Sequence, residues 1–437
     1  MVARSPIGEG AARRGGARGG AIVSEDFETV ANRLDVLMIG PFPSDETRIE
    51  GGVQASLYGL ARHLLRRDDI ASLRVFATPK RVGGALRRET VAGVDVTFLT
   101  APKRFLVSMV LHVPAIVRLL AQSDRPVVHL HGSGLFEAAV MAACRWYGVP
   151  LVWTMHGITE KETLETWRRQ PSVAGWLRHM LYRTCERFQL RLAREMIVDT
   201  PYVARSVAGR AAAEPQAIPQ GIFLDELAAA DRADRTGGHK VLALGVIDPR
   251  KGHRFTIEAF AEVAKRVPDA RLEIIGSLTS TAHLAELHEA VIACGLRDKV
   301  EILPDQPRER VLRALAEARL FALHSQEESQ GIAICEALAV GLPVVSTTSG
   351  GIPDVVGGSG AGYLVEYGNV AGFAEHIVQV LTDDGMQTLM SAAARRRGHD
   401  FDWVEVTRRV VECYARAVTA AGDRRPTPIA AAEPHRN

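Results

Sequence analysis

The chain has 437 residues, of which 47% are hydrophobic and 24% are charged, a composition typical of a globular protein with a sizeable core. Because domains usually contain about 100–200 residues, the length predicts two or three of them. Lys and Arg total 53 and Asp and Glu total 51, and the resulting formal net charge of +2 argues against a protein that grips nucleic acid over its whole surface.

The first segment, residues 1–33, is predicted to be a disordered basic tail. Its first twenty residues include six Gly and four Arg, and they contain no apolar run of the length that a signal peptide needs. A mitochondrial presequence is the weaker alternative, because this much Gly would destabilise its helix.

A first series of strands and helices follows the tail. Residues 34–40 form a short continuous apolar run, as buried parallel strands do, and a helical pattern follows over 52–65. The longest apolar run, 105–117, is shorter than a membrane-spanning helix. We interpret it as a buried helix and leave open a surface helix that contacts anionic lipid through its basic flanks. Further strands are expected at 73–77, 94–99, 127–131 and 151–155.

A second series of strands and helices opens with the apolar run 240–247. Alternation of strands and helices at this spacing predicts parallel sheets joined by right-handed crossovers. The stretch 213–238 between the two series is rich in Pro and Gly, so we place a hinge there. The expected elements after the first strand are helix 252–266, strand 271–275, helix 283–293, strand 300–303, helix 308–318, strand 320–324, helix 331–340 and strand 343–347.

The predicted architecture is therefore α/β, with two Rossmann-like domains that face each other across a cleft. A last helical pattern places Trp403, Val410 and Tyr414 on one apolar face, and we expect this helix to pack back on the N-terminal domain. The predicted divisions are an N-terminal domain at 34–218, a C-terminal domain at 219–400, the crossover helix at 401–418 and a disordered tail at 419–437.

The most informative segment is 324–356, which reads HSQEESQGIAICEALAVGLPVVSTTSGGIPDVV. Ligands bind beyond the carboxyl ends of the strands in such sheets, and Glu328 lies in the loop after a predicted strand. The helix expected to begin at Gly331 offers unpaired backbone N–H groups to a phosphate. A carboxylate at Glu336 suits paired hydroxyls such as those of a ribose. Taken alone, the two Glu residues would be read as solvated residues at a helix start.

This segment resembles the signature of the retaining family 4 glycosyltransferases, which have the GT-B architecture. The resemblance is specific in the C-terminal half and looser over the rest of 34–418. The matching residues are Glu328, Glu336, Ala337, Gly341, Pro343, Val344, Gly350, Gly351, Pro353 and Asp354.

The resemblance implies a role for each of these positions. Glu336 would hold the nucleotide ribose, and Glu328 would contact the donor sugar. The backbone amides of Gly331, Ile332 and Ala333 would contact the diphosphate or the sugar.

A second loop resembles the family's diphosphate loop, Asp248-Pro249-Arg250-Lys251-Gly252. Lys251 matches the family's Lys, whose charge would stabilise the departing diphosphate. Val246 stands where the family usually has an Arg, and Arg250 is the candidate to supply that charge. A solvated loop lysine is the alternative for Lys251.

The N-terminal half offers weaker candidates. Gly52, after Gly51, starts a helix where the family has a similar Gly-rich start near the diphosphate and acceptor, although a simple turn would also explain it. His156 matches a family His near the donor sugar or the reacting centre, and His131 ends the neighbouring strand. Either could instead be a core histidine. We expect His129 and His131 to point to opposite faces of their strand.

The implied function is transfer of a hexosyl group from a nucleotide-diphosphate sugar to an acceptor hydroxyl, with retention of configuration, in polysaccharide or glycoconjugate synthesis. A sugar-nucleotide epimerase, a phosphorylase or a non-catalytic nucleotide-sugar-binding protein on the same fold are the alternatives. No metal-ligand spacing of His, Cys and Asp appears, so we expect no metal and no cofactor.

The expected partners are the nucleotide sugar and a saccharide or lipid-linked acceptor, without nucleic acid. The five Cys are scattered and include no C-x-x-C pair, which favours a reducing compartment. We therefore expect a cytoplasmic protein and leave open peripheral contact with the inner face of the membrane.

Overall fold

The computed structural model describes residues 33–45, 49, 51–78, 87–99, 113, 117, 126–231 and 238–421. Of the predicted tails at 1–33 and 419–437, residues 1–32 and 422–437 lie outside the described residues. Of the apolar run 105–117, only Val113 and Val117 are described, and both are buried in the core. In the part of the chain that is described, no helix is both long enough and apolar enough to cross a membrane.

The first half of the chain forms an eight-stranded sheet in the order β3-β4-β2-β1-β5-β6-β7-β8. All of its strand pairs are parallel except the β3–β4 hairpin. Its strands are β1 (Leu34–Gly40), β2 (Ile70–Ala77), β3 (Arg87–Val91), β4 (Val94–Phe98), β5 (Pro126–His131), β6 (Leu151–Met155), β7 (Glu195–Val198) and β8 (Gln216–Ala217). Its helices are α2 (Gly52–Leu64), α4 (Leu135–Tyr147), α5 (Thr159–Arg169), α6 (Val173–Leu192) and α7 (Pro201–Val207).

The second half forms a six-stranded parallel sheet in the order β11-β10-β9-β12-β13-β14. Its strands are β9 (Lys240–Leu244), β10 (Arg271–Gly276), β11 (Val300–Pro304), β12 (Leu320–Leu323), β13 (Val344–Thr347) and β14 (Gly362–Val365). Its α-helices are α8 (Leu224–Leu227), α9 (His253–Arg266), α10 (Thr281–Ala293), α11 (Arg308–Glu317), α12 (Ile332–Ala339), α13 (Ile352–Val356), α14 (Val370–Thr382) and α15 (Asp384–Gly398), and its 3-10 turns are η1 (Ala228–Ala230), η2 (Pro249–Lys251) and η3 (His399–Phe401).

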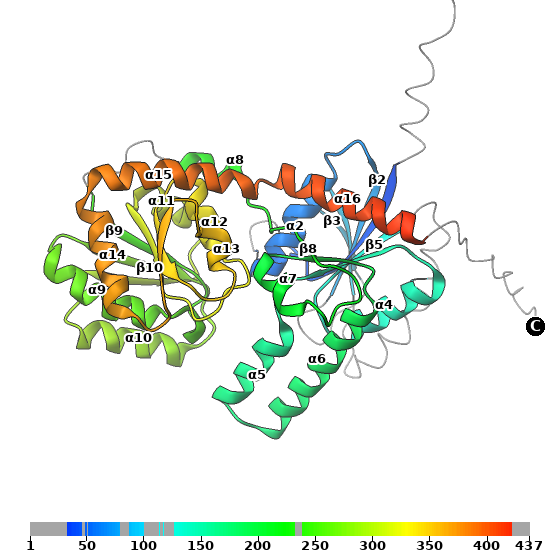
Figure 1. The fold of residues 1–437 in the computed structure, drawn as a ribbon, viewed down its shortest axis with the longest axis horizontal. Helices are drawn as coiled ribbons and strands as arrows, with labels where there is room; N and C mark the ends of the chain where they lie inside the picture. The colour runs from blue at the N-terminus through cyan, green and yellow to red at the C-terminus, as the bar shows by residue number, and fades with distance from the viewer. Residues whose placement is uncertain are drawn as a thin grey trace, which may run out of the picture.

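Both sheets are covered on both faces, because successive apolar residues of a strand point to opposite sides. On β1, Val36 and Met38 enter one hydrophobic cluster, whereas Leu37 and Ile39 enter another. This double burial explains why the central strands read as continuous apolar runs in the sequence. The predicted two-domain α/β architecture is confirmed (Figure 1).

The last helix, α16 (Trp403–Ala421), crosses from the second domain to the first (Figure 1). Trp403, Val410 and Tyr414 are fully buried in the hydrophobic cluster that α2 and β1 form. The predicted crossover is therefore confirmed. The helix ends at Ala421, so Thr419, Ala420 and Ala421, which were predicted to belong to the tail, are its last three residues.

Each sheet reverses its strand order at one point, and ligands bind at such switch points. In the first sheet, β1 lies between β2 and β5, and in the second, β9 lies between β10 and β12. Gly52, Lys251 and Glu328 follow β1, β9 and β12 respectively, and His131 is the last residue of β5. The fold therefore places all four predicted segments at switch points.

Candidate active site

Lys251 and Glu328 meet at the switch point of the second sheet. Lys251 ends the turn η2 after β9, which Asp248 caps by accepting the Arg250 backbone N–H at 2.9 Å. Glu328 lies in the loop between β12 and α12 and is 7% exposed. The Lys251 Nζ atom lies 2.5 Å from Glu328 Oε1. Such a charge-assisted pair at a strand end is suited to bind both an anion and a hydroxyl.

The backbone of Glu328 is fixed by two glycines. Its carbonyl accepts the Gly351 N–H at 2.7 Å, and a Cβ on Gly350 would lie only 2.1 Å from the same oxygen. Gly350 also has φ +62°, a region that other residues rarely adopt. The Gly-Gly pair of the signature therefore lets two loops approach each other and hold the Glu328 side chain in place.

The start of α12 presents free amide groups beside this pair. Gly331, with φ +84°, precedes the helix, and its carbonyl accepts the N–H groups of Ile334 and Cys335. Among the described residues, no acceptor is found for the amides of Ile332 and Ala333. Unpaired amides at a helix start favour an anion.

Gly52, at the start of α2 in the first domain, faces this helix start. A Cβ on Gly52 would lie 3.2 Å from Cδ1 of Ile332. The two domains therefore bring two helix starts together, and the predicted donor-site residues Gly52 and Ile332 are neighbours across the interface.

Glu336 pairs with a residue that the sequence did not suggest. Its Oε1 atom lies 2.7 Å from Nη2 of Arg308, at the start of α11, and Arg308 also lies 3.6 Å from Glu226. Burial disfavours the charged form of Arg308, but the two carboxylates outweigh it and raise the pKa of the guanidinium. Arg308 thus fixes one oxygen of the Glu336 carboxylate.

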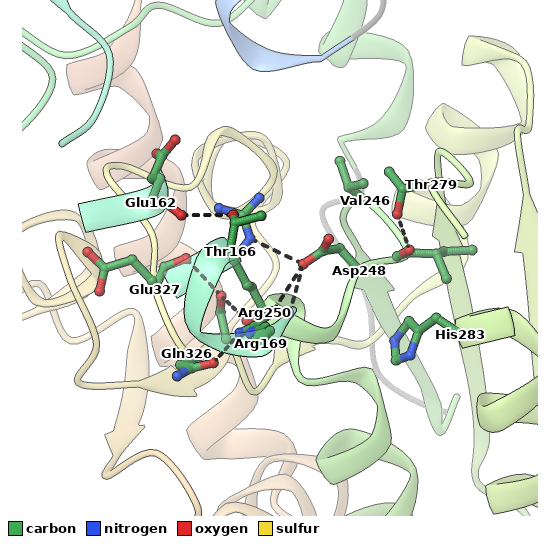
Figure 2. A network of polar contacts seen from close by, with 12 residues as sticks. Glu162, Thr166, Arg169, Val246, Asp248, Arg250, Thr279, His283, Gln326 and Glu327 are labelled. Atoms are coloured by element: carbon green, nitrogen blue, oxygen red, sulfur yellow. Dashed lines mark hydrogen bonds and ion pairs between the residues drawn. The ribbon is translucent and has the colours of Figure 1, made fainter. Parts of the chain in front are cut away.

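Helix α5 of the first domain contacts both loops of the second. Arg169 donates to Gln326 Oε1 at 2.7 Å and lies 3.9 Å from Asp248 (Figure 2). Arg250 extends from the same loop, with its Nε 3.2 Å from Asp248 Oδ1 (Figure 2). The predicted diphosphate cation Arg250 is therefore engaged by its own loop, and Arg169 adds another cation beside it.

A second bridge between the domains centres on Glu327, the residue before Glu328. Its two carboxylate oxygens accept from Lys161 Nζ at 2.7 Å and from the Tyr202 hydroxyl at 2.9 Å. The neighbouring Ser329 carbonyl accepts the Thr200 hydroxyl at 2.8 Å. The loop 324–331 between β12 and α12, called the signature loop below, is therefore bound by side chains of the first domain.

The histidines at the ends of β5 and β6 form a connected cluster. His156 Nε2 lies 2.9 Å from His131 Nδ1, and His156 Nδ1 lies 3.4 Å from Oδ1 of Asp199. The described contacts of His156 are thus to His131 and Asp199 rather than to Lys251 or Glu328. Burial, with the neighbouring His129 and His156 rings, holds the pKa of His131 well below its ordinary value.

The expectation that His129 and His131 point to opposite faces is wrong. Their ring centroids lie 4.0 Å apart. Side chains alternate along a strand with a period of two, so residues two positions apart share a face. His129 is held there by Tyr414 of α16 at 2.8 Å and by Thr154 at 2.7 Å.

Several residues of this region were not predicted from the sequence. Asp199 directly follows the short strand β7, which was not predicted, so the rule that sites follow strand ends was never applied to it. Arg308 starts a predicted helix after a predicted strand, and that rule could have selected it. Within the described residues, no three His, Cys, Asp or Glu side chains are grouped so as to hold a metal ion.

Two family models match consecutive parts of the chain. Residues 50–226 match the model described as Glycosyltransferase Family 4, and residues 228–397 match the model described as Glycosyl transferases group 1. The boundary between the two matches falls in the segment that joins the two sheets.

Similar proteins are also named as glycosyltransferases. A D-inositol 3-phosphate glycosyltransferase of Mycolicibacterium smegmatis is 28% identical over 93% of this chain and 96% of its own. One of the same name from Mycobacteroides abscessus is 29% identical over 67% of this chain and 66% of its own length.

Solved structures share the fold. The sucrose-phosphate synthase of Thermosynechococcus elongatus has a TM-score of 0.70 at 20% identity, covering 89% of this chain and 100% of that one. The HepE protein of Anabaena, solved in complex with UDP and glucose, has a TM-score of 0.64 at 18% identity, covering 87% and 99% respectively.

Proposed function

The chain belongs to the group 1, family 4 glycosyltransferases, and we propose that it transfers a hexosyl group from a nucleotide-diphosphate sugar to an acceptor hydroxyl with retention of configuration and without a metal ion. The observation that carries the proposal is the Lys251–Glu328 pair beside the free amides that open α12. A cation, unpaired N–H donors and a carboxylate together suit a sugar diphosphate, which carries both anionic and hydroxyl groups.

In the proposed reaction the bond between the anomeric carbon and the diphosphate oxygen breaks while the acceptor oxygen bonds to the same face of that carbon. The acceptor proton passes to the departing diphosphate. Negative charge grows on the diphosphate, and Lys251 with the amides of Ile332 and Ala333 stabilises it. Arg250 is a further candidate cation. Contact between the two domains excludes water from the reacting centre, which limits hydrolysis of the donor.

The remaining candidates bind rather than react. Glu328 accepts hydroxyls of the donor sugar, and Glu336, with one oxygen already held by Arg308, accepts hydroxyls of the nucleotide ribose through the other. His156 lies at the carboxyl end of β6 and faces the transferred sugar. Gly52 keeps the start of α2 close enough for its backbone to approach the diphosphate.

We propose that the acceptor is a saccharide or a lipid-linked molecule and that the reaction takes place in the cytoplasm. If the acceptor is lipid-linked, the reaction takes place at the inner face of the membrane. The five cysteines, all free thiols, fit a reducing compartment. The relatives are named for D-inositol 3-phosphate, so a polyol phosphate belongs among the acceptors to be assayed.

Donor binding is tested by thermal unfolding with UDP, GDP and ADP and their sugars. UDP is the first choice because a protein of the same fold binds it. A ligand at 100 times its dissociation constant should stabilise the protein by about 2.7 kcal/mol. If none of the three nucleotides or their sugars raises the melting temperature, the proposal is wrong.

Turnover separates transfer from the alternatives. Transfer consumes the donor only with an acceptor, and an epimerase converts it alone. A binding protein shows the thermal shift without product. The coupling constant of the anomeric proton in the product, compared with the donor, tests retention, and an unchanged rate in EDTA tests metal independence.

A further inference from the structure

Helix α6 turns an apolar face away from the protein. With α5 it forms a hairpin that projects from the first domain (Figure 1). Val173 is 77% exposed, Leu177 56% and Trp176 45%. The residues of this face recur at the spacing of one helical stripe; they are Val173, Trp176, Leu177, Met180, Leu181 and Phe188.

The inward side of the same helix is mixed: it buries Cys185 and Leu190, but also three polar side chains. His179 contacts the Thr163 hydroxyl at 3.0 Å, Glu186 accepts the Glu160 backbone N–H at 3.0 Å, and Gln189 is buried beside the end of β5. These contacts set the rotation of α6. Amphipathic helices normally bury their apolar side, so this orientation leaves a stripe without a partner among the described residues.

The stripe is surrounded by positive charge. Helix α6 carries Arg178, Arg183, Arg187 and Arg191, and its one acidic residue is the buried Glu186. At 20 residues the helix is about 30 Å long. At its far end Arg191 lines one hollow in which four arginines (Arg145, Arg191, Arg194, Arg416) outnumber two carboxylates (Glu195, Glu214). Trp146, beside Arg145, is 84% exposed. A Trp near each end and flanking Arg side chains are typical of helices that lie in a membrane interface.

We propose that the outward stripe of α6, with its flanking arginines, docks on the surface of an anionic lipid bilayer. The charge distribution selects this occupant over a second copy of the chain. Two copies joined through the stripe would bring the arginines of their α6 helices together, which is unfavourable. The carboxylate that contacts arginines of α6, Glu160, is already shared by Arg183, Arg187 and Arg210.

The inference stands independently of the proposed reaction, although it would bring the active site to a lipid-linked acceptor. Because α5 links this hairpin to the signature loop through Lys161 and Arg169, the docked face and the reaction site belong to one structural unit.

The test is flotation of the full chain with vesicles of phosphatidylcholine alone and of equimolar phosphatidylcholine and phosphatidylglycerol. We expect binding only to the anionic vesicles. Raising the salt from about 0.1 M to about 1 M shortens the screening length from about 10 Å to about 3 Å and should weaken that binding.

The decisive variant is Trp176→Ser/Leu177→Ser, which removes two exposed apolar side chains of the stripe without touching the inward polar contacts. We expect its partition onto anionic vesicles to fall by about tenfold or more. The matched control, Leu389→Ser/Ile292→Ser, removes exposed apolar side chains from α15 and α10 of the other domain, and its binding should equal that of the wild type.

Absence of flotation with anionic vesicles, or equal flotation of the stripe variant and the wild type at equal melting temperatures, would overturn the inference. A dimer in sedimentation that the stripe variant abolishes, without vesicle binding, would assign the stripe to a second copy instead. The nucleotide shift in melting temperature, measured on the same samples, reports on the proposed reaction separately.

Discussion

The Nζ atom of Lys251 lies 2.5 Å from Oε1 of Glu328, although the two residues are 77 positions apart in the sequence. The pair joins the loop after β9 to the loop after β12, the two strands that flank the switch point of the second sheet. Each residue therefore positions the other, in addition to any contact that it makes with a donor.

We predict that Lys251→Ala lowers kcat by about 10²–10³-fold, the usual effect of removing one group that stabilises developing charge. Glu328→Gln, which keeps the shape and removes the charge, should lower kcat and leave the fold intact. Both are measured as initial rates at saturating donor, with melting temperatures recorded.

The control for this pair is Lys265→Ala. Lys265 forms an exposed ion pair with Glu262 on α9, the helix that follows the Lys251 loop, so the same change of residue type should leave kcat as it is. If both Lys251→Ala and Glu328→Gln keep the wild-type kcat, these residues do not contribute to catalysis.

Arg308 should act on donor binding rather than on the chemical step, because it restrains Glu336, the predicted ribose ligand. We predict that Arg308→Ala raises the KM for the donor about tenfold, or about 1.4 kcal/mol, with kcat close to the wild-type value. Titration calorimetry with the nucleoside diphosphate should show the same loss.

Arg313, on the same helix and exposed, provides the matched control for this prediction, and Arg313→Ala should bind the nucleotide normally. An Arg308→Ala protein whose kcat falls while its KM stays constant would contradict the positioning role.

The central strands could be predicted because both their faces are buried. Runs such as 34–40 and 151–155 coincide with β1 and β6. Strand β7 and the helices α5 and α6 were not predicted. Strand β7 has only four residues, too few to show a clear pattern. In α6 the inward residues include three polar ones and an apolar stripe faces outward, so its pattern does not indicate which side faces the protein.

The residues of the candidate site also fall into those that could be predicted from the sequence and those that could not. Lys251, Glu328 and Glu336 could be selected because they lie in contiguous strings that resemble a family signature. Asp199 and Lys161 could not, because their importance comes from partners far away in the chain; Lys161 and Glu327 are 166 positions apart. Only the fold brings such residues together.

Asp199 should matter through His156, whose Nδ1 atom lies 3.4 Å from its Oδ1. We predict that Asp199→Asn and His156→Ala each lower kcat/KM by about tenfold or more, and that the double variant is scarcely worse than either. Non-additivity of this kind identifies two residues that act as one unit.

The chain offers a matched control in His239 and Asp269, an exposed pair at 2.6 Å. Asp269→Asn should leave kcat/KM unchanged. Because Asp199 also accepts from Gln220 at 2.7 Å, melting temperatures must accompany the rates. Additive losses in the double variant would mean that Asp199 supports the hinge and not the histidine.

Trp403 anchors the crossover helix and should be the most costly apolar residue to remove from it. It is 1% exposed, and a Cβ on Gly59 or Gly221 would lie within 2.4 Å or 2.3 Å of its ring. We predict that Trp403→Ala lowers the free energy of unfolding by about 3–5 kcal/mol, measured by urea denaturation. Val404→Ala, at the exposed neighbouring position, should change it little, and equal losses in both variants would contradict the packing role.

Acid should destabilise the protein below pH 6.5 because histidines are buried in their neutral form. Burial lowers the pKa of His129 to about 3 and those of His253 and His324 to about 4. In the unfolded chain these groups bind a proton near pH 6.5, so as pH falls from there to their folded pKa values the unfolded state gains more protons and stability is lost.

Glu186 works in the opposite direction. Burial raises its pKa to about 7, so its folded form binds a proton between pH 7 and 4.5, where the unfolded carboxyl is still ionised, and it stabilises the protein as pH falls. We predict that the urea midpoint decreases from pH 6.5 to 4.5 and that Glu186→Gln makes the decrease steeper. A midpoint that rises on acidification, or a slope that Glu186→Gln makes shallower, would show that other groups control acid stability.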